Sequence, residues 1–243
     1  MDIDQFLGLV KKRRSMRLFK PDQVPDESIE KILECARWSM SGANGQPWEF
    51  IVVKEPDTRG KIVDIMTEQL KRSRPIEMTR LEEIRMPQLA EPVKGKVGIK
   101  NAPVIIVVCG DPRTYQATVL AHQFYSSEYD NFHMSLGNTA MIMHLAAAAL
   151  GLGSRWVTVN RPWEEDIKRL LDVPKEFRIY MVVPIGYRAY DPPPTFRREL
   201  DEIVHHENYD WGKYRKDEDI IKFLIKLRKK TRPAYSVERK KGK

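Results

Sequence analysis

The sequence predicts a single layered domain in which helices pack on a sheet. Helical and strand patterns alternate along the chain without an internal repeat. Residues Pro103–Cys109 are almost continuously apolar, which is typical of a strand covered on both faces. Residues Met134–Leu150 are apolar nearly all round, which is typical of a buried helix. One core must therefore enclose both segments. Hydrophobic periodicity leaves open whether the strands run parallel or antiparallel.

Composition excludes several classes of protein. The chain has 243 residues, of which 42% are hydrophobic and 31% charged, so it is neither disordered nor collagen-like. No apolar run approaches the roughly 18 residues of a membrane span, and the start at Met1–Gln5 is unlike a signal peptide, so we expect a cytoplasmic protein. Cys35 and Cys109 lack the spacing of a zinc site or a dithiol, so redox chemistry would require a cofactor.

The N-terminal third predicts the order helix, helix, strand, helix. Apolar residues at i, i+3, i+4 and i+7 over Ile3–Val10 predict an amphipathic helix that ends in the basic run Lys11–Arg14. Acidic residues open a second helix over Asp26–Met40. Phe50–Val53 is a predicted strand, and the apolar positions of Ile62–Leu70 predict the next helix.

The middle of the chain contains an excursion and the most apolar elements. Residues 67–100 have three prolines, many charges and no aromatic side chain, which predicts a surface segment rather than core. Between Tyr115 and Phe132 aromatic residues concentrate, and they either pack inside or roof a pocket. The helix Met134–Leu150 is expected to end at Gly151.

The C-terminal part predicts two more strands and two helices. Arg155–Val159 and Arg178–Ile185 are the strands, with a helix over Trp163–Leu171 between them. Asp217–Lys230 starts acidic, ends basic and has one apolar face, so it predicts a helix. With no strand after it, this helix either docks on its own chain or reaches another subunit.

The net charge of +8 is confined to the C-terminal tail. Residues Gly212–Lys243 carry 13 basic and 4 acidic side chains, so the tail holds +9 and the rest of the chain −1. A terminal basic segment either contacts an anionic partner or stays solvated.

Three distant segments favour anion binding and polar turns. Arg13–Arg17 places guanidinium groups around a hydroxyl, a good phosphate clamp, although a basic run at a helix end also complements the helix dipole. Ser39–Phe50 is a polar loop with two glycines that can direct amides and hydroxyls at a ring. Pro184–Tyr187 is followed, after a proline-rich turn, by Phe196–Leu200.

These segments carry a family resemblance. RRSMR, SGANGQPWEF, and VPIGYRAY with RRELDEIVHHE resemble, in order and spacing, the FMN-dependent nitroreductase family over residues 5–211. The resemblance implies an α+β fold with a mostly antiparallel sheet wrapped by helices. It also implies an intertwined homodimer with FMN at the subunit interface. We therefore expect an FMN-binding domain over residues 1–211 and, over 212–243, a basic extension whose helix packs on the partner subunit.

The resemblance assigns cofactor contacts to the arginines. Arg13, Arg14 and Ser15 would hold the FMN phosphate and ribityl chain. Arg17 would lie near the N1 and C2 edge of the ring, where its charge favours hydride acceptance. A late phosphate contact would come from one of Arg197 and Arg198.

The resemblance places two backbone turns on the ring. Ser41, Gly42 and Asn44 would approach the flavin from the partner subunit. Pro184, Ile185 and Gly186 would lie along one ring face, with an amide near Gly186 addressing N5. Arg17 and Gly186 are thus the two implied catalytic positions.

The implied activity is hydride transfer. NADH or NADPH would reduce the bound FMN, leave, and be replaced by a nitroaromatic, quinone or similar acceptor in a ping-pong mechanism. Alternatives are a reductive dehalogenase-like or flavin-fragmenting member of the family, or a nucleic-acid or acidic-partner binding module acting through the tail. Phe124 and Tyr125 are the candidate substrate contacts.

No metal site is expected. His122, His133 and His144 recur every eleven residues, but Asp130 and Asn131 are predicted to break the helix between the first two. The helix around His144 also lacks the Gln-Asn pair of many family members, which leaves open what that helix contributes to the site.

Overall fold

The computed structural model describes residues 2–86, 89, 98–116 and 127–241. The chain divides into two compact units. The first contains Met1–Gln69 and Lys96–Asp191, and the second contains Leu70–Gly95 and Pro192–Lys243. No helix among the described residues is long and apolar enough to cross a membrane.

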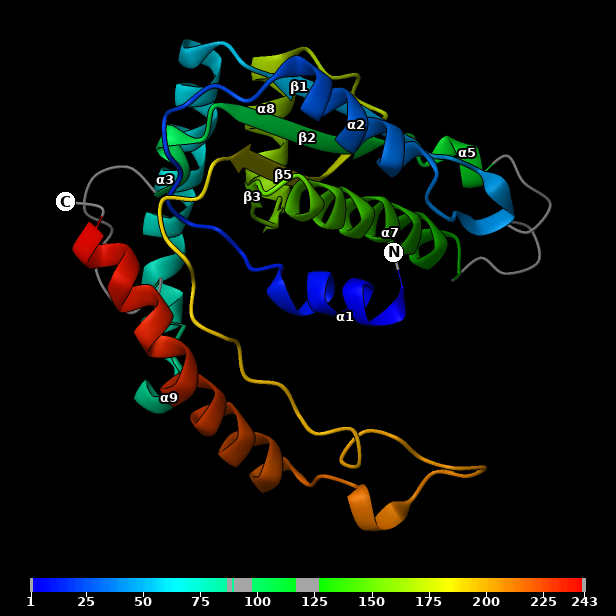
Figure 1. The fold of residues 1–243 in the computed structure, drawn as a ribbon, viewed down its shortest axis with the longest axis vertical. Coiled ribbons are helices and arrows are strands. Elements are labelled where there is room, and N and C mark those ends of the chain that lie inside the picture. The colour runs from blue at the N-terminus through cyan, green and yellow to red at the C-terminus, as the bar shows by residue number, and fades with distance from the viewer. Residues whose placement is uncertain (1, 87–88, 90–97, 117–126, 242–243) are drawn as a thin grey trace. The chain divides into compact units, whose positions relative to one another are not determined.

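An antiparallel sheet forms the centre of the first unit (Figure 1). Its order is β1 (Trp48–Val53), β2 (Val104–Gly110), β5 (Arg178–Gly186) and β3 (Gly153–Ser154), and β4 (Val157–Thr158) also pairs with β5. Every strand pair is antiparallel, which confirms the α+β expectation and decides what periodicity left open.

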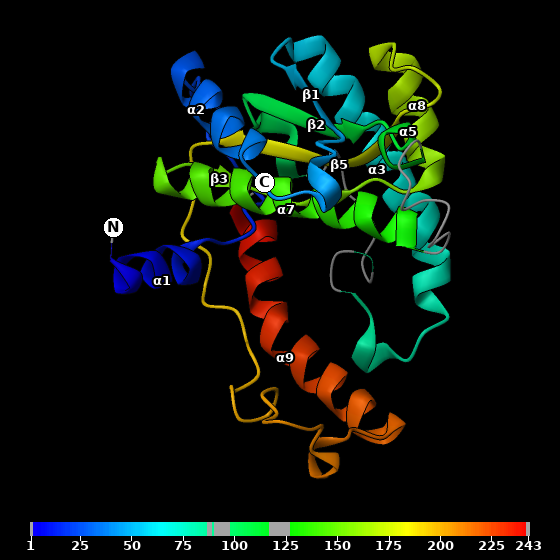
Figure 2. The same ribbon diagram turned by 90° about the vertical axis from the view of Figure 1, so that its right-hand side faces the viewer.

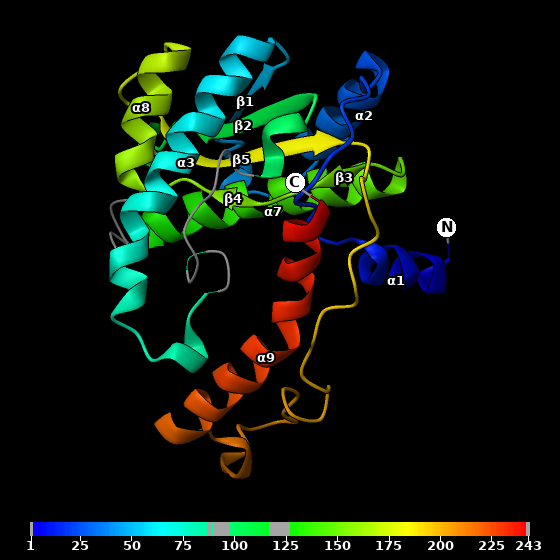
Figure 3. The ribbon, with the colours of Figure 1, turned by 90° about the vertical axis from the view of Figure 1, so that its left-hand side faces the viewer.

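Strand β2 lies between β1 and β5 and is buried along its whole length, as its apolar run predicts. On one face Ile106 and Val108 join a core with α2 (Asp26–Arg37) and α7 (Ser127–Ala149). Ile105 and Val107 point to the other face and are fully buried. Figures 2 and 3 show α8 (Arg161–Leu171) on the opposite side of the sheet from α7.

Helix α7 is longer than the sequence predicts. It begins at Ser127 and runs through Asp130 and Asn131, so the expected break there is wrong. The helix ends as expected: Gly151 has φ +74°, its amide donates to the Ala148 carbonyl at 3.1 Å, and the next amide donates to Ala147 at 2.9 Å. This paired bonding is a Schellman motif, which glycine favours because it adopts the left-handed conformation without strain.

The other elements of the first unit differ from the prediction mainly at their ends. Helix α1 (Ile3–Lys12) forms as predicted, with a capping box between Asp2 and Gln5. Helix α2 stops at Arg37, so Met40 lies beyond it and is 80% exposed. The single strand expected over residues 155–159 is wrong: two short strands, β3 and β4, pair with β5 instead.

Helix α3 (Pro56–Met78) runs from the first unit into the second. The expectation that residues 67–100 form only a surface excursion is wrong at two places. The helix continues to Met78 with Pro75 inside it, and Ile99 in the short helix η3 (Gly98–Asn101) is fully buried. The amphipathic pattern fades in this half of α3 because its buried positions include polar residues such as Gln69.

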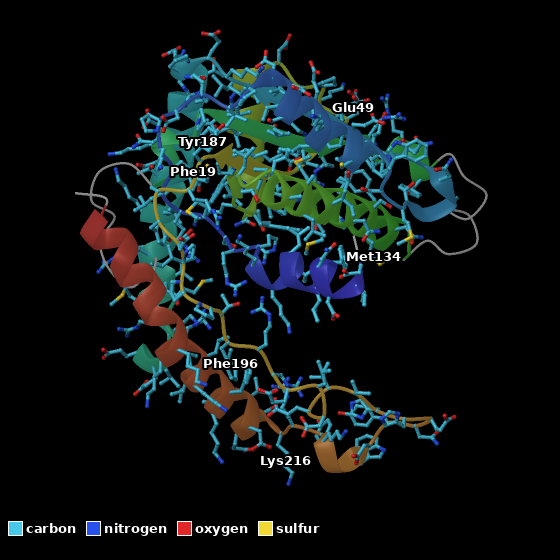
Figure 4. The ribbon with its side chains drawn as sticks, in the orientation of Figure 1. Phe19, Glu49, Met134, Tyr187, Phe196 and Lys216 are labelled. Atoms are coloured by element: carbon cyan, nitrogen blue, oxygen red, sulfur yellow. The ribbon has the colours of Figure 1, made fainter. Side chains whose placement is uncertain are left out.

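The second unit is organised around α9 (Asp217–Lys241), which extends well past the predicted end at Lys230. Helix α9 contacts the short helix η2 (Glu82–Ile84), and the Arg228 Nε donates to the Ile84 carbonyl at 3.2 Å. The extension therefore docks on its own chain at this point. Figure 4 shows Phe196 beside α9, where its ring lies 6.1 Å from that of Phe223.

Candidate functional site

The arginine-rich segment that follows α1 is fixed by backbone pairing. The amide of Met16 donates to the Ser154 carbonyl at 2.9 Å, and Ser15 forms a parallel bridge with Ser154. Further along, the amide of Lys20 donates to the Tyr187 carbonyl at 3.0 Å. Figure 4 shows Phe19 close to Tyr187. The segment therefore runs beside β3 and the end of β5, two regions more than 130 residues away in sequence.

The candidate phosphate ligands lie within this paired segment. Arg13, Arg14, Ser15 and Arg17 are all partly buried. The Arg14 Nη1 donates to the carbonyls of Lys11 and Arg13, the latter at 2.8 Å, so this side chain caps the end of α1. Its Nε is buried without an acceptor among the described residues. A concentration of guanidinium groups with an unused donor suits an anion such as phosphate.

The Pro184–Gly186 segment forms the buried end of β5. Gly186 pairs with Gly153, and a Cβ on Gly186 would come within 2.5 Å of Pro103 Cδ. A Cβ on Gly153 would lie 2.9 Å from Met16 Cγ. Gly153 is required because Met16 of the arginine segment approaches it too closely for a side chain, and Gly186 because Pro103, just before β2, does the same.

His144 lies on α7 and contacts β3, the strand that joins the arginine segment to the end of β5. Its Nδ1 is 2.8 Å from the Ser154 Oγ, and its ring stacks on Trp156 at 6.0 Å. Burial, and secondarily the charge of Arg13, lowers the pKa of His144 to about 4. The imidazole is therefore neutral at physiological pH.

The loop after α2 forms a second cluster of polar residues, which contacts α7, the helix that contains His144. Ala43, Asn44 and Gln46 have φ values of 49°, 54° and 44°, a strained conformation for residues other than glycine. Such strain concentrates at functional sites. The Ser135 Oγ of α7 accepts from the amide of Gly42 at 3.3 Å.

Two further hydroxyls fix this loop. The Ser41 Oγ accepts from the amide of Gln46 at 3.1 Å. The Tyr115 Oη lies 2.9 Å from the Ser135 Oγ, which connects the loop, α7 and α5 (Arg113–Gln116). Ser41 and Gly42 are partly buried, whereas Asn44 is exposed.

The polar loop and strand β3 contact separate turns of α7. Ser135 holds the loop and His144 holds β3, and these positions lie nine residues apart. At 1.5 Å per residue, that separation is about 14 Å along the helix axis. The arginine segment and the strand end are thus brought together within one chain, and the loop lies further along the same helix.

The candidate late arginines belong to the second unit. Arg198 is engaged locally: its Nη2 donates to the Glu202 carbonyl, and its Nε lies 3.8 Å from the Glu202 Oε2. Arg197 is exposed, and its Nη1 donates to the neighbouring Phe196 carbonyl at 2.9 Å. Phe196 itself packs against α9, with the Lys230 Nζ 4.5 Å above its ring.

The remaining candidates are the substrate contacts, the histidines and the cysteines. Phe124 and Tyr125 lie outside the described residues, as does His122. Within the described part of the chain, no group of three or more His, Cys, Asp or Glu side chains could hold a metal ion. Cys109 is buried, and its burial raises the pKa of the thiol to about 12, so it is no nucleophile at physiological pH.

Ser154 and His144 are the residues that the sequence does not reveal as parts of the site. Ser154 follows Gly151–Gly153 in the segment AAAALGLGSRWV, which the family resemblance also covers but to which it assigns no role. His144 recurs with His122 and His133 every eleven residues, a spacing from which no site is expected. The useful signal is a histidine beside the alanine run of a buried helix, because a buried polar group requires a partner.

The fold and this site define an α+β protein with a cationic, strand-end site suited to an anionic ligand. Residues 10–187 match the sequence model of the nitroreductase family. The chain belongs to this family, which confirms the resemblance and supports its assignment as an oxidoreductase.

Individual relatives agree with this membership. The chain is 28% identical over 214 residues to mouse iodotyrosine deiodinase 1, covering 84% of this chain and 70% of that protein. It is 31% identical over 189 residues to a Methanothermobacter thermautotrophicus protein named as an NADH dehydrogenase/NAD(P)H nitroreductase, covering 76% and 78%. Among solved structures, an FMN-dependent nitroreductase from Clostridium difficile R20291 has a TM-score of 0.61 at 26% identity, covering 84% of this chain and 99% of that chain.

Proposed function

We propose that the protein is an FMN-dependent oxidoreductase. It would pass hydride from NADH or NADPH to a nitroaromatic, quinone or similar conjugated acceptor. The observation that carries the proposal is the backbone pairing of the arginine segment with the end of β5 through Ser154. This pairing unites the two family motifs most directly concerned with the cofactor, and the related Clostridium difficile structure is named as FMN-dependent.

The residues present fit FMN. Arg13 and Arg14 supply cationic donors for a phosphate, and the buried Arg14 Nε has no acceptor among the described residues. Ser15 adds a hydroxyl for the phosphate or ribityl chain. Bound FMN would supply the two-electron chemistry, which no side chain among those described at this site provides.

The residues of the chain itself would bind the flavin and orient its ring. Arg17 would stabilise negative charge at the N1 and C2 edge of the ring, and a backbone amide near Gly186 would address N5. Pro184 and Ile185 would lie along one face of the ring. Among the described residues at this site we assign no side chain to general acid–base work, so the proposed catalysis depends on position and electrostatics.

We propose that the functional form is a homodimer. The apolar face of α1 remains uncovered in one chain, with Ile3, Phe6, Leu7 and Val10 between 38% and 74% exposed. Helix α7, which α1 contacts, exposes Met134 and Met141 by 57% and 46%. A second copy would cover these faces and bring its Ser41, Gly42 and Asn44 loop to the flavin. Beyond its contact with η2 in its own chain, the basic extension would serve as an arm that packs on the partner.

Purification and flavin titration test the proposal. The protein should purify yellow or bind FMN with 1:1 stoichiometry per chain. It should then oxidise NADH or NADPH only in the presence of an acceptor. Parallel assays with nitroaromatics and quinones would measure the acceptor range. A colourless protein that does not bind added FMN would refute the proposed function.

A second candidate activity is reductive dehalogenation, favoured by the 28% identity to mouse iodotyrosine deiodinase 1. The cofactor and its binding residues would be the same, and only the acceptor would differ. Assays of the reduced protein with halogenated phenols separate the two. Faster turnover of halogenated phenols than of nitroaromatics and quinones would favour the second candidate.

A further inference from the structure

His144 is a buried titratable group that the proposed chemistry does not use. It is 3% exposed and lies on α7, near the end of the helix. One ring nitrogen, Nδ1, lies 2.8 Å from the Ser154 Oγ, and the ring stacks on Trp156 with an interplanar angle of 26°. The ring is therefore held on one face and at one nitrogen.

Ser154 joins the two cofactor-binding segments. Its carbonyl accepts the Met16 amide at 2.9 Å, and it bridges Ser15 in the arginine segment. On its other side Ser154 pairs with Ile185 at the end of β5. The alignment of Ser15 with Ile185 depends on where this one residue lies, and strand β3, which contains it, has only two residues.

The other nitrogen of His144 explains why the ring must stay neutral. Nε2 is buried and has no hydrogen-bond partner among the described residues. An imidazolium would leave a buried N–H without an acceptor and would add a positive charge close to Arg13, whose charge already acts on His144. The neutral ring makes a single hydrogen bond, and that bond is to Ser154.

We propose that His144 is a positioning residue: its hydrogen bond to Ser154 fixes the alignment of the arginine segment with the end of β5, and so preorganises the FMN site. The inference rests on the proposed function. It assigns to α7 a contribution that the missing Gln-Asn pair left open. In this account His144 acts through its hydrogen bond to Ser154 and not by contact with the cofactor.

Four variants of the full-length protein test the inference. His144→Phe keeps a flat ring against Trp156 but removes the hydrogen bond. His144→Asn loses the ring, but its side-chain amide can take the place of Nδ1 and keep the hydrogen bond to Ser154. Ser154→Ala removes the partner hydroxyl. His133→Phe is the matched control, since His133 lies on the same helix with its ring 5.8 Å from that of Tyr180. The measurement is FMN affinity from flavin fluorescence, with far-UV circular dichroism to confirm folding.

We expect His144→Phe and Ser154→Ala each to weaken FMN binding about tenfold or more, because each strands one partner of a buried hydrogen bond. His144→Asn should bind within a few-fold of wild type, and His133→Phe should match wild type. The order of FMN affinities of the two His144 variants is informative. If His144 only fills the core, His144→Phe will bind FMN more tightly than His144→Asn. A fifth protein that combines His144→Phe with Ser154→Ala should bind FMN no more weakly than the weaker of these two single variants.

Unchanged FMN affinity in either His144→Phe or Ser154→Ala would overturn the inference. Tighter FMN binding by His144→Phe than by His144→Asn would also overturn it. If His144→Phe does not fold, the result for Ser154→Ala decides alone. A wild-type protein that binds no FMN would overturn the proposed function and this inference together. Tight binding by wild type with equally tight binding by these variants would overturn the inference only.

Discussion

The side chain of His144 gives the protein a predictable dependence of stability on pH. Burial, and then the charge of Arg13, lowers its pKa from 6.5 to about 4 in the folded protein. The unfolded chain therefore takes up this proton at a higher pH than the folded chain does. Stability from this group is complete above the unfolded pKa and is lost as pH falls toward the folded pKa.

Unfolding in urea at two pH values measures this effect. Between pH 7 and pH 5, His144 should lower the unfolding free energy of wild type by about 2 kcal/mol. His144→Asn, which does not titrate there, should lose less stability over the same interval by about that amount. Equal losses in the two proteins would show that His144 is protonated as easily in the folded state as in the unfolded state.

Arg13 and one of the late arginines are each predicted, from the family resemblance, to contact the FMN phosphate. Arg13→Ala and Arg197→Ala should each weaken FMN binding by about 1.5 to 3 kcal/mol, because each removes a charge-assisted hydrogen bond. Arg197 is the stronger candidate of the late pair, since Arg198 is engaged by Glu202.

The control for the arginine variants is Arg169→Ala, which removes an exposed guanidinium paired with Asp166 on α8. Fluorescence titration of FMN measures all three. Wild-type affinity in Arg13→Ala and Arg197→Ala would show that the phosphate lies elsewhere.

Among the elements, helix α8 is anchored to β5 by a buried carboxylate. Glu164 is 3% exposed and accepts from the Arg178 Nε at 2.7 Å and Nη2 at 2.9 Å. It also accepts from the amide of Ile179 at 3.0 Å. Burial alone raises the pKa of Glu164, but these hydrogen bonds and the charges of Arg178 and Lys168 outweigh burial, so the pKa lies below its ordinary value.

Glu164→Gln should therefore destabilise the protein by about 3 kcal/mol, because it leaves the Arg178 charge without its carboxylate. Urea unfolding measures the change. Asp166→Asn on the same helix breaks only an exposed ion pair with Arg169 and should cost less than about 1 kcal/mol. Similar losses in both variants would contradict the anchoring role of Glu164.

At the scale of the whole molecule, the uncovered face of α1 predicts a second copy. Leu7→Glu places a charge within that face and should weaken the dimer by about 3 kcal/mol, roughly a hundredfold. Gln5→Glu adds the same charge on the opposite face of α1 and preserves the capping box, so it should leave the dimer intact. Light scattering after size exclusion over a range of concentrations measures both; a wild-type monomer would refute the dimer.

The basic extension is the second feature at this scale. Removing residues 212–243 should weaken the dimer if the extension packs on the partner. It should not change binding to duplex DNA, which we expect to be weak in the full-length protein. Tight DNA binding that falls steeply with salt and disappears on truncation would instead support the nucleic-acid alternative.

Local pattern determines most of the helices and the long strands of this protein. The periodicity of α1 predicts a helix, the apolar run of β2 predicts a strand, and the glycine after α7 predicts a helix end, each within a few residues of the observed bounds. For the helix and the strand, this is because burial on one or two faces dictates residue type there. The order of the arginine, polar-loop and strand-end motifs likewise indicates the family and the site residues that we propose.

Tertiary structure decided what depends on partners distant in sequence. Strands β3 and β4 are too short to show a pattern of their own and exist because β5 pairs with them. The antiparallel order of the sheet comes from the same pairing. The Ser154–His144 contact depends on a turn that brings the end of α7 to the arginine segment, and no local propensity encodes the partner of a single buried hydrogen bond.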